Sequence, residues 1–286
     1  METPLPKNGK FLMLALDHRE GFRKIINPES PDAVSKDLIV NYKFQILTSL
    51  KDQFTACLID DDYGLPAYKM LNPQPKTPFL LAIENTGFRE ENGERITIVE
   101  KKAEDLKKLG ASAVKLLIYF NPDAKSATRQ METAKKIIED VHTNGLPLFL
   151  EIVTYTTEEE DKVLDSLKAF ITNDVKPDVW KLEFPGSEEL CELVTEECKG
   201  TPWILLTRGA SYSLFCDQLE IAVKNGCQGF LAGRSLWQDL LQIKNENEKQ
   251  TFLKVTLPSR FDELKEIVVN FSKRSGGLPQ KHEISF

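Results

Sequence analysis

The sequence contains few histidines and few cysteines, and each shortage excludes a class of protein. A histidine-rich zinc site is not expected, because of the three histidines His142 falls in a predicted helix and His282 in a polar C-terminal segment, leaving His18 alone near a strand end. The five cysteines are odd in number and include no Cys-x-x-Cys pair, which argues against a disulfide framework or a zinc knuckle. We interpret them as reduced thiols that mostly fill packing positions.

An excess of positive charge is also missing. The net charge is -7, from 37 basic and 44 acidic residues, which argues against a nucleic-acid or anionic-membrane partner. No apolar run approaches the ~20 residues that cross a bilayer, and the N-terminus does not have the form of a signal peptide. We therefore expect a cytoplasmic protein that binds a small molecule, assembles as a homo-oligomer, and has neither a nucleic-acid nor a membrane partner.

Three common sequence motifs for cofactor binding or catalysis are absent as well. The first apolar run is not followed by the Gly-x-Gly-x-x-Gly turn typical of dinucleotide-binding sheets, and there is neither a Gly-x-Ser-x-Gly elbow nor a Walker loop. The chemistry must therefore come from another arrangement of side chains.

Eight short apolar runs alternate with segments of helical period. The runs cover residues 11–17, 54–60, 78–84, 111–119, 146–155, 178–184, 202–208 and 227–233. The predicted helices cover 33–51, 97–109, 123–143, 158–173, 187–198 and 211–225, with a weak one after 62 and one or two beyond 234. This count predicts an α/β protein with a single (β/α)₈ TIM barrel over residues 1–286. A doubly wound open sheet is the alternative.

Local signals support two of the predicted helix starts. Thr157 with Glu160 three residues later forms a capping-box pattern, and Asp123 follows Pro122 just before another helical segment.

Polar residues recur at the ends of the predicted strands, which is where TIM barrels place their chemistry. They are Asp17, Asp60, Glu84, Lys115, Glu151, Lys181, Glu183, Thr207, Arg208 and Arg234. Plainer interpretations stay open for several of them. Asp60 with the next two aspartates can solvate a turn, Glu84 and Glu183 can pair with lysines, and Asp17, Asp60 and Glu84 could hold magnesium. The charged runs at 90–95 and 157–161 read as solvated surface.

Lys181 lies in the middle of the apolar run "DVWKLEF", where an unpaired ammonium would cost several kcal/mol. One interpretation is a structural ion pair with Glu151 or Asp17. The other is an amine nucleophile, because burial and a second cation, Lys115, both favour the neutral amine. A neutral lysine at a barrel mouth attacks carbonyl carbons.

Six motifs in order along the chain resemble a known family. "MLALDHREGF", "ASAVKLLIYFNPD", "PLFLEIVTY", "PDVWKLEFP", "ILLTRGAS" and "GFLAGRSLW" are similar to strand ends of the class I aldolases of the tagatose 1,6-bisphosphate aldolase and sulfofructose-phosphate aldolase group. The sequence also resembles the aldolase-type domain fused to 5-dehydro-2-deoxygluconokinase.

The resemblance implies a role for each matching residue. Lys181 would form the Schiff base, Glu151 would be the acid/base, Lys115 the second lysine and Asp17 the first-strand carboxylate. Substrate and phosphate would be bound by His18, Arg19, Thr207, Gly209, Ala210, Gly233 and Arg234. Two positions depart from the family pattern. Asp17-His18 stands where many relatives have Asp-Gln, and Thr207-Arg208-Gly209 stands where the tagatose enzymes have a turn of small residues.

The sequence therefore predicts a lyase that cleaves a phosphorylated ketose into dihydroxyacetone phosphate and an aldehyde, with no cofactor. The alternatives are a transaldolase, a 5-dehydro-2-deoxy-phosphogluconate aldolase and a non-catalytic sugar-phosphate-binding barrel. In a regular strand Thr207 would face the lumen, whereas Arg208 would share a face with Leu206 and point away from it. Arg234 could alternatively form a surface ion pair with Asp239 or a nearby glutamate.

Overall fold

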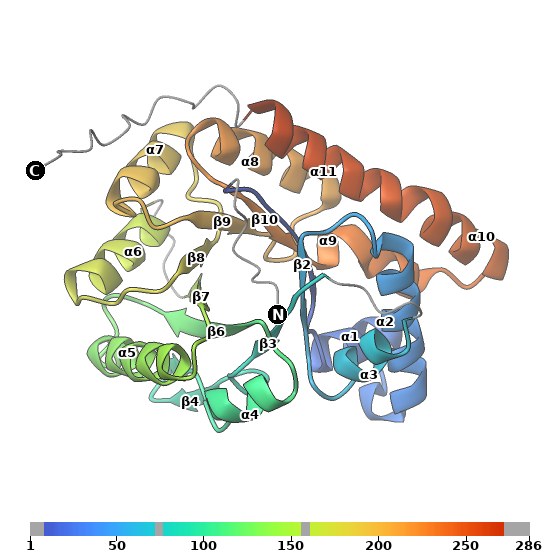
Figure 1. The fold of residues 1–286 in the computed structure, drawn as a ribbon, viewed down its shortest axis with the longest axis horizontal. Coiled ribbons are helices and arrows are strands. Elements are labelled where there is room, and N and C mark those ends of the chain that lie inside the picture. The colour runs from blue at the N-terminus through green and yellow to red at the C-terminus, as the bar shows by residue number, and fades with distance from the viewer. Residues whose placement is uncertain (1–8, 72–76, 156–160, 272–286) are drawn as a thin grey trace, which may run out of the picture.

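Eight parallel strands form a closed barrel in the computed structural model, which describes residues 9–71, 77–155 and 161–271 (Figure 1). Around the barrel the strands lie in the order β1-β10-β9-β8-β7-β6-β3-β2. They are β1 (Phe11–Leu16), β2 (Ala56–Ile59), β3 (Phe79–Ala82), β6 (Ala113–Phe120), β7 (Leu148–Thr154), β8 (Val179–Leu182), β9 (Trp203–Leu206) and β10 (Gly229–Ala232). Each predicted apolar run coincides with one of them, and only β6 extends beyond its run, by the one residue Phe120. The TIM-barrel prediction is confirmed, and the doubly wound alternative is wrong.

Helices cover the outside of the barrel (Figure 1). They are α1 (Glu20–Ile26), α2 (Lys36–Leu50), α3 (Gly64–Lys69), α4 (Ala103–Lys108), α5 (Ala127–Thr143), α6 (Lys162–Thr172), α7 (Glu188–Glu197), α8 (Tyr212–Lys224), α9 (Arg234–Trp237), α10 (Glu246–Thr251) and α11 (Leu257–Phe271). Short 3₁₀ turns occupy Pro31–Ala33 and Gln238–Gln242, and a π-helical segment, Phe252–Thr256, joins α10 to α11.

Several local predictions are corrected by the structure. The sequence did not indicate α1 or the antiparallel hairpin β4 (Arg89–Glu91) and β5 (Glu94–Ile96). Of the one or two helices predicted beyond 234, two are present, α10 and α11, and the short α9 begins at Arg234 itself. The helix predicted over 97–109 begins only at Ala103, because Val99 forms a bridge with Glu84. Asp123 does not cap α5, which begins after Ser126. The capping box at 157–160 and His282 lie outside the described residues.

Side chains alternate between the lumen of the barrel and its helical shell, as the period of a strand requires. The lumen is filled by one apolar cluster made of Phe11, Met13, Ala15, Ala56, Leu58, Leu80, Ala113, Phe149, Val179, Ile204 and Leu231. Two residues further along their strands, the same face carries Lys115 on β6, Glu151 on β7 and Lys181 on β8. Glu151 and Lys181 are direct neighbours in the register of β7 and β8. The fold therefore directs three charged side chains into the mouth of the barrel.

All five cysteines are free thiols, and four of them are buried, in agreement with the packing role expected for most of them. Within the described ranges, no helix is long and apolar enough to span a membrane.

Candidate active site

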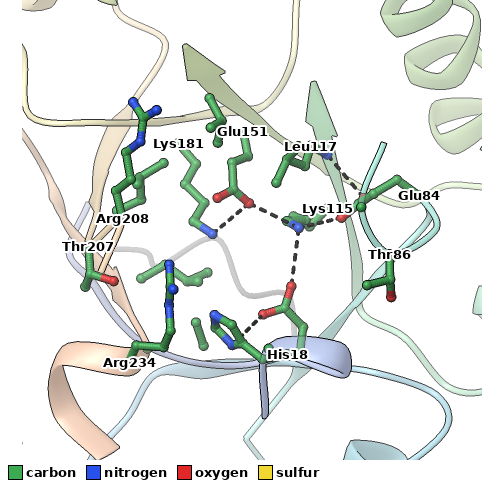
Figure 2. Close-up of a pocket in the computed structure, with 18 of the residues that line it drawn as sticks. His18, Glu84, Thr86, Lys115, Leu117, Glu151, Lys181, Thr207, Arg208 and Arg234 are labelled. Carbon is green, nitrogen blue, oxygen red and sulfur yellow. Dashed lines mark hydrogen bonds and ion pairs between the residues drawn. The ribbon is translucent and has the colours of Figure 1, made fainter. Parts of the chain in front are cut away.

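A cavity of about 440 Å³ opens at the C-terminal ends of the strands (Figure 2). Side chains from most of the barrel strands and from the segments that follow them reach it. Its ionisable lining consists of Asp17, His18, Arg19, Glu84, Arg95, Lys115, Glu151, Lys181, Arg208 and Arg234. The strand-end residues picked out in the sequence therefore meet in one place, with the exceptions of Asp60 and Glu183, which are described below.

Glu151 lies between the two lysines of the barrel mouth (Figure 2). Its Oε2 is 2.8 Å from Lys181 Nζ and 3.1 Å from Lys115 Nζ. Burial alone would raise the pKa of Glu151, but the charges of Lys115 and Lys181 outweigh it and hold the pKa below its usual value. Glu151 is therefore a carboxylate that two ammonium groups can share. Val153, expected on the same strand face, also lines the cavity.

Lys115 is surrounded by carboxylates. Its Nζ lies 2.5 Å from Glu84 Oε1, 3.1 Å from Glu151 Oε2 and 3.3 Å from Asp17 Oδ2. Burial favours the neutral amine, yet the three acids outweigh burial and raise the pKa of Lys115 well above its usual value. The charge of Lys115 in turn holds the pKa of Asp17 far below its usual range, against the effect of burial. Lys115 is thus a fixed ammonium ion.

Lys181 has fewer partners than Lys115. Its amine donates to Glu151, and no second hydrogen bond from it is formed within the described part of the chain. Lys181 therefore does form the ion pair that a purely structural role requires. Its side chain also lines the cavity, which that structural role does not require.

Asp60 lies below the mouth and does not line the cavity. It forms a buried ion pair with Lys43 of α2 and accepts hydrogen bonds from the backbone N–H groups of Tyr63 (2.7 Å) and Gly64 (3.0 Å). Lys43 also donates to the carbonyls of Leu16 and His18, at 2.8 Å each. Asp60 is therefore fully buried and does not simply solvate a turn.

The magnesium alternative has little support in these contacts. Asp60 binds Lys43, whereas Asp17 and Glu84 both bind Lys115. Among the residues that the structure describes, no group of three His, Cys, Asp or Glu side chains is arranged to hold a metal ion.

His18 and Arg19 follow β1 and line the cavity. The His18 ring contacts Trp237 edge to face, and its Nδ1 lies 3.6 Å from Asp17 Oδ1. Burial lowers the pKa of His18 to about 4, more than Asp17 raises it, so the ring is neutral at pH 7. Arg19 donates to the Glu84 carbonyl at 3.4 Å and lies 3.8 Å from Asp62.

Arg234 follows β10 and presents a guanidinium to the cavity (Figure 2). Its Nε is buried without a hydrogen-bond partner, and it forms no ion pair with any described residue. Asp239 binds Arg260 instead at 2.7 Å, so the predicted alternative of a surface pair is wrong. A Cβ on Gly209 would lie 3.3 Å from Arg234 Nη2, which shows how closely this guanidinium approaches the turn after β9.

The other residues of the predicted phosphate site divide between two cavities. Gly233 lines the main cavity, Gly209 and Ala210 line a neighbouring one of about 350 Å³, and Thr207 lines both. Ser211 caps α8 by accepting a hydrogen bond from the backbone N–H of Leu214.

Arg208 does not point away from the lumen as predicted. Ile204 belongs to the luminal cluster, so Leu206 and Arg208 follow it on the inward face. The strand ends at Leu206, and Arg208 adopts a left-handed conformation with φ 43°. Its guanidinium forms an ion pair with Glu183 and donates to the Thr154 carbonyl at 2.6 Å. Glu183 is therefore the structural partner of an arginine, not of a lysine.

Arg95 is a cavity residue that the sequence analysis missed, because the run at 90–95 was interpreted as solvated surface. The hairpin of β4 and β5 brings Arg95 to the cavity. The signal was Asn92-Gly93, a pair that favours a tight hairpin turn, and both residues have positive φ (54° and 81°).

Comparison with known proteins identifies the family. The model of the DeoC/LacD family aldolases matches residues 11–239. The chain belongs to this family. It is 27% identical to tagatose 1,6-diphosphate aldolase of Lactococcus lactis subsp. lactis and 28% identical to tagatose 1,6-diphosphate aldolase 1 of Streptococcus mutans, with 94% of each chain covered in both cases.

A solved structure of a Schiff-base-forming fructose-1,6-bisphosphate aldolase has the same fold. The TM-score is 0.63 at 20% identity, over 92% of this chain and 95% of that one. The prediction that the chain is a class I aldolase, a carbon–carbon lyase, is confirmed at the level of the family.

Proposed function

We propose that the enzyme cleaves a phosphorylated ketose into dihydroxyacetone phosphate and an aldehyde through a Schiff base on Lys181. The observation that carries this proposal is the difference between the two lysines of the mouth. Lys115 is held by three carboxylates, whereas Lys181 is hydrogen-bonded to one, which it shares. When Lys181 loses its proton, Glu151 still has Lys115 as a counter-ion.

The chemistry follows from this arrangement. The Lys181 amine attacks the C2 carbonyl to form a carbinolamine, and loss of water gives an iminium ion. The iminium accepts the electron pair of the C3–C4 bond as that bond breaks, while the C4 hydroxyl loses its proton and becomes an aldehyde. Glu151, 2.8 Å from Lys181 Nζ, is placed to donate and accept these protons. Protonation of the enamine at C3 and hydrolysis release dihydroxyacetone phosphate and free Lys181.

The remaining predicted site residues have supporting roles in the proposal. Arg234, with its unpaired guanidinium, and the backbone N–H groups near Gly233 would bind the phosphate on C1, beside Thr207. Lys115 and Asp17 would hydrogen-bond the substrate hydroxyls, and His18 and Arg19 would contact the substrate from the end of β1. Residues 1–286 would form one domain, which we expect to assemble as a cytoplasmic homo-oligomer.

Covalent trapping tests the mechanism directly. Incubation with dihydroxyacetone phosphate and borohydride should add one triose-phosphate mass, located on Lys181 by peptide mapping. Lys181→Met should abolish the adduct, and Lys43→Met, a control at a buried lysine that does not line the cavity, should retain it. An adduct on Lys115, or none with the wild-type protein, would contradict the proposal.

A panel of ketose phosphates tests the substrate. Tagatose 1,6-bisphosphate is the first compound to assay because the curated relatives carry that name, followed by sulfofructose 1-phosphate and 5-dehydro-2-deoxy-6-phosphogluconate. Release of free dihydroxyacetone phosphate from either 1-phosphate ketose supports an aldolase of this type. Triose transfer that occurs only with an acceptor present would indicate a transaldolase. Binding without an adduct would indicate a sugar-phosphate-binding barrel.

A further inference from the structure

The cavity contains four arginines, and they differ in how their charges are balanced. Arg208 forms an ion pair with Glu183, and Arg19 lies within 4.0 Å of Asp61 and 3.8 Å of Asp62. Arg234 and Arg95 form no ion pair with any residue in the described ranges. Unbalanced guanidinium groups that face a cavity are well suited to bind anionic ligand groups.

The backbone of Arg95 is held firmly in place. Its N–H donates to the Tyr155 hydroxyl at 3.2 Å, and its carbonyl accepts a hydrogen bond from Gln130 at 3.2 Å. The preceding residue, Glu94, accepts hydrogen bonds from the backbone N–H groups of Lys125 and Ser126, both at 2.9 Å. The hairpin is therefore fixed to the loop before α5, and the side chain of Arg95 leaves it from a defined position.

Two aromatic rings flank the guanidinium of Arg95. Its Cζ lies 4.8 Å from the centroid of Phe88 and 5.3 Å from that of Tyr155. Such contacts orient the guanidinium plane but do not neutralise its positive charge. Two acids of the hairpin are engaged elsewhere, Glu91 with Arg89 and Arg129 and Glu94 with the backbone. The third, Glu90, lies opposite Arg95 in the strand register but forms no ion pair with it. The positive charge of Arg95 is thus kept available to the cavity.

The topology places Arg95 opposite Arg234. Arg234 follows β10, whereas the hairpin packs on β6, where the Tyr119 N–H donates to Thr97 Oγ1 at 3.1 Å. In the order β10-β9-β8-β7-β6, these two strands are four places apart in a ring of eight. Lys181 lies on β8, two places from each. Around the barrel, Arg234 and Arg95 therefore lie on opposite sides of Lys181.

We propose that Arg95 binds the anionic group at the end of the substrate remote from Arg234. This inference rests on the proposed function. A phosphate and a sulfonate share the chemistry required, because each presents several charged oxygens to the guanidinium donors. Arg95 is thereby a specificity-determining residue for the aldehyde half of the substrate.

The test uses the condensation reaction, with dihydroxyacetone phosphate fixed and the acceptor varied among glyceraldehyde 3-phosphate, 3-sulfolactaldehyde and unsubstituted glyceraldehyde. Arg95→Met, which keeps much of the apolar stem, should lower kcat/KM roughly 10–100-fold for the anionic acceptor that the wild type prefers, mainly through KM. Its kcat/KM for glyceraldehyde should stay within about 3-fold. Arg95→Lys should restore part of the loss. Whichever anionic acceptor shows the larger loss identifies the group as phosphate or sulfonate.

Arg89→Met is the matched control, since Arg89 lies on the same hairpin but is exposed and paired with Glu91. It should leave the kinetics with every acceptor unchanged. Equal losses with charged and neutral acceptors in Arg95→Met, or a wild type indifferent to the acceptor's charge, would overturn the inference. Borohydride trapping separates the two proposals, because dihydroxyacetone phosphate occupies only the Arg234 side. An adduct on Lys181 in Arg95→Met shows that the variant is folded and that the proposed function stands, whatever the acceptor kinetics give.

Discussion

Two buried clusters in this barrel contain a lysine next to a carboxylate, and they differ in what else the lysine touches. Lys43 and Asp60 are sealed from solvent, at 0% and 1% side-chain exposure. The Lys43 amine donates to Asp60 and to the carbonyls of Leu16 and His18, which uses all three of its N–H groups. Among the described residues, the Lys181 amine has one acceptor, Glu151, and the side chain faces a cavity. Every N–H group of the Lys43 amine therefore has an acceptor, whereas the Lys181 amine borders a cavity that can hold a ligand.

The difference shows why burial alone does not identify a catalytic lysine. Burial outweighs the charge of Asp60 and lowers the pKa of Lys43, yet an amine with three bound acceptors has no path to an electrophile. Lys115 represents a third case, because it is accessible but fixed as an ammonium by three carboxylates. Only Lys181 among these three combines access with an incomplete set of acceptors.

Lys181→Met should have the largest effect. Removing the nucleophile leaves no route to the iminium, so turnover should fall at least ~10⁴-fold in an assay of dihydroxyacetone phosphate release. Stability should change little, because Glu151 keeps Lys115 as a partner 3.1 Å away. Urea unfolding provides the second measurement. Turnover within about 100-fold of wild type would show that Lys181 is a structural residue.

Glu151→Gln should come next. An amide cannot exchange protons with the carbinolamine or the C4 hydroxyl, so kcat should fall roughly 10²–10⁴-fold with a smaller change in KM. Glu183→Gln is the matched control, since Glu183 is a buried acid on the next strand that binds Arg208 and Thr154. A loss in the control as large as in Glu151→Gln would indicate that both acids act through the structure of the mouth.

Lys43→Met should mainly reduce stability. It leaves the buried Asp60 without its only ion-pair partner in the described part of the chain, which typically costs about 3–5 kcal/mol in the free energy of unfolding. The double variant Lys43→Met with Asp60→Asn should recover much of this loss in urea unfolding, because no uncompensated charge remains. A single variant as stable as wild type would show that the pair contributes nothing.

The same residues show which parts of the fold and of the site can be predicted from the sequence. The eight strands were predictable because each is a short apolar run, and the charges at Lys115, Glu151 and Lys181 stood out because each interrupts one. The partner of Asp60 was not predictable, because Lys43 reaches it from the face of a separate helix. The direction of Arg208 was predicted wrongly because the inward face of its strand was assigned to Thr207, whereas Ile204, Leu206 and Arg208 share that face. Its left-handed backbone and its bond to Glu183 arise beyond the end of the strand, where the sequence carries no signal for them.

Arg95 was missed for a related reason. In the sequence its hairpin looks like any solvated charged loop, and only the packing against β6, Phe88 and Tyr155 turns one of those charges toward the cavity. Side chains positioned by the strands of the barrel can thus be predicted from strand period. Side chains positioned by excursions between strands require the tertiary structure.

The smallest expected effect concerns His18 and pH. Burial lowers the pKa of His18 in the folded protein to about 4, whereas an unfolded chain titrates near 6.5. Between these values the unfolded state binds the proton and the folded state does not, so the contribution of His18 to stability is complete above pH 6.5 and declines as the pH falls toward 4. His18→Gln removes this titration, and the urea midpoint should then fall less between pH 7 and pH 5 than in wild type. His142→Gln, at an exposed histidine bound to Asp178 and outside the cavity, is the matched substitution to measure alongside it. Equal slopes in wild type and His18→Gln would show that the pKa of His18 does not change on folding, and a smaller fall in wild type than in the variant would show that Asp17 keeps the ring protonated in the folded enzyme.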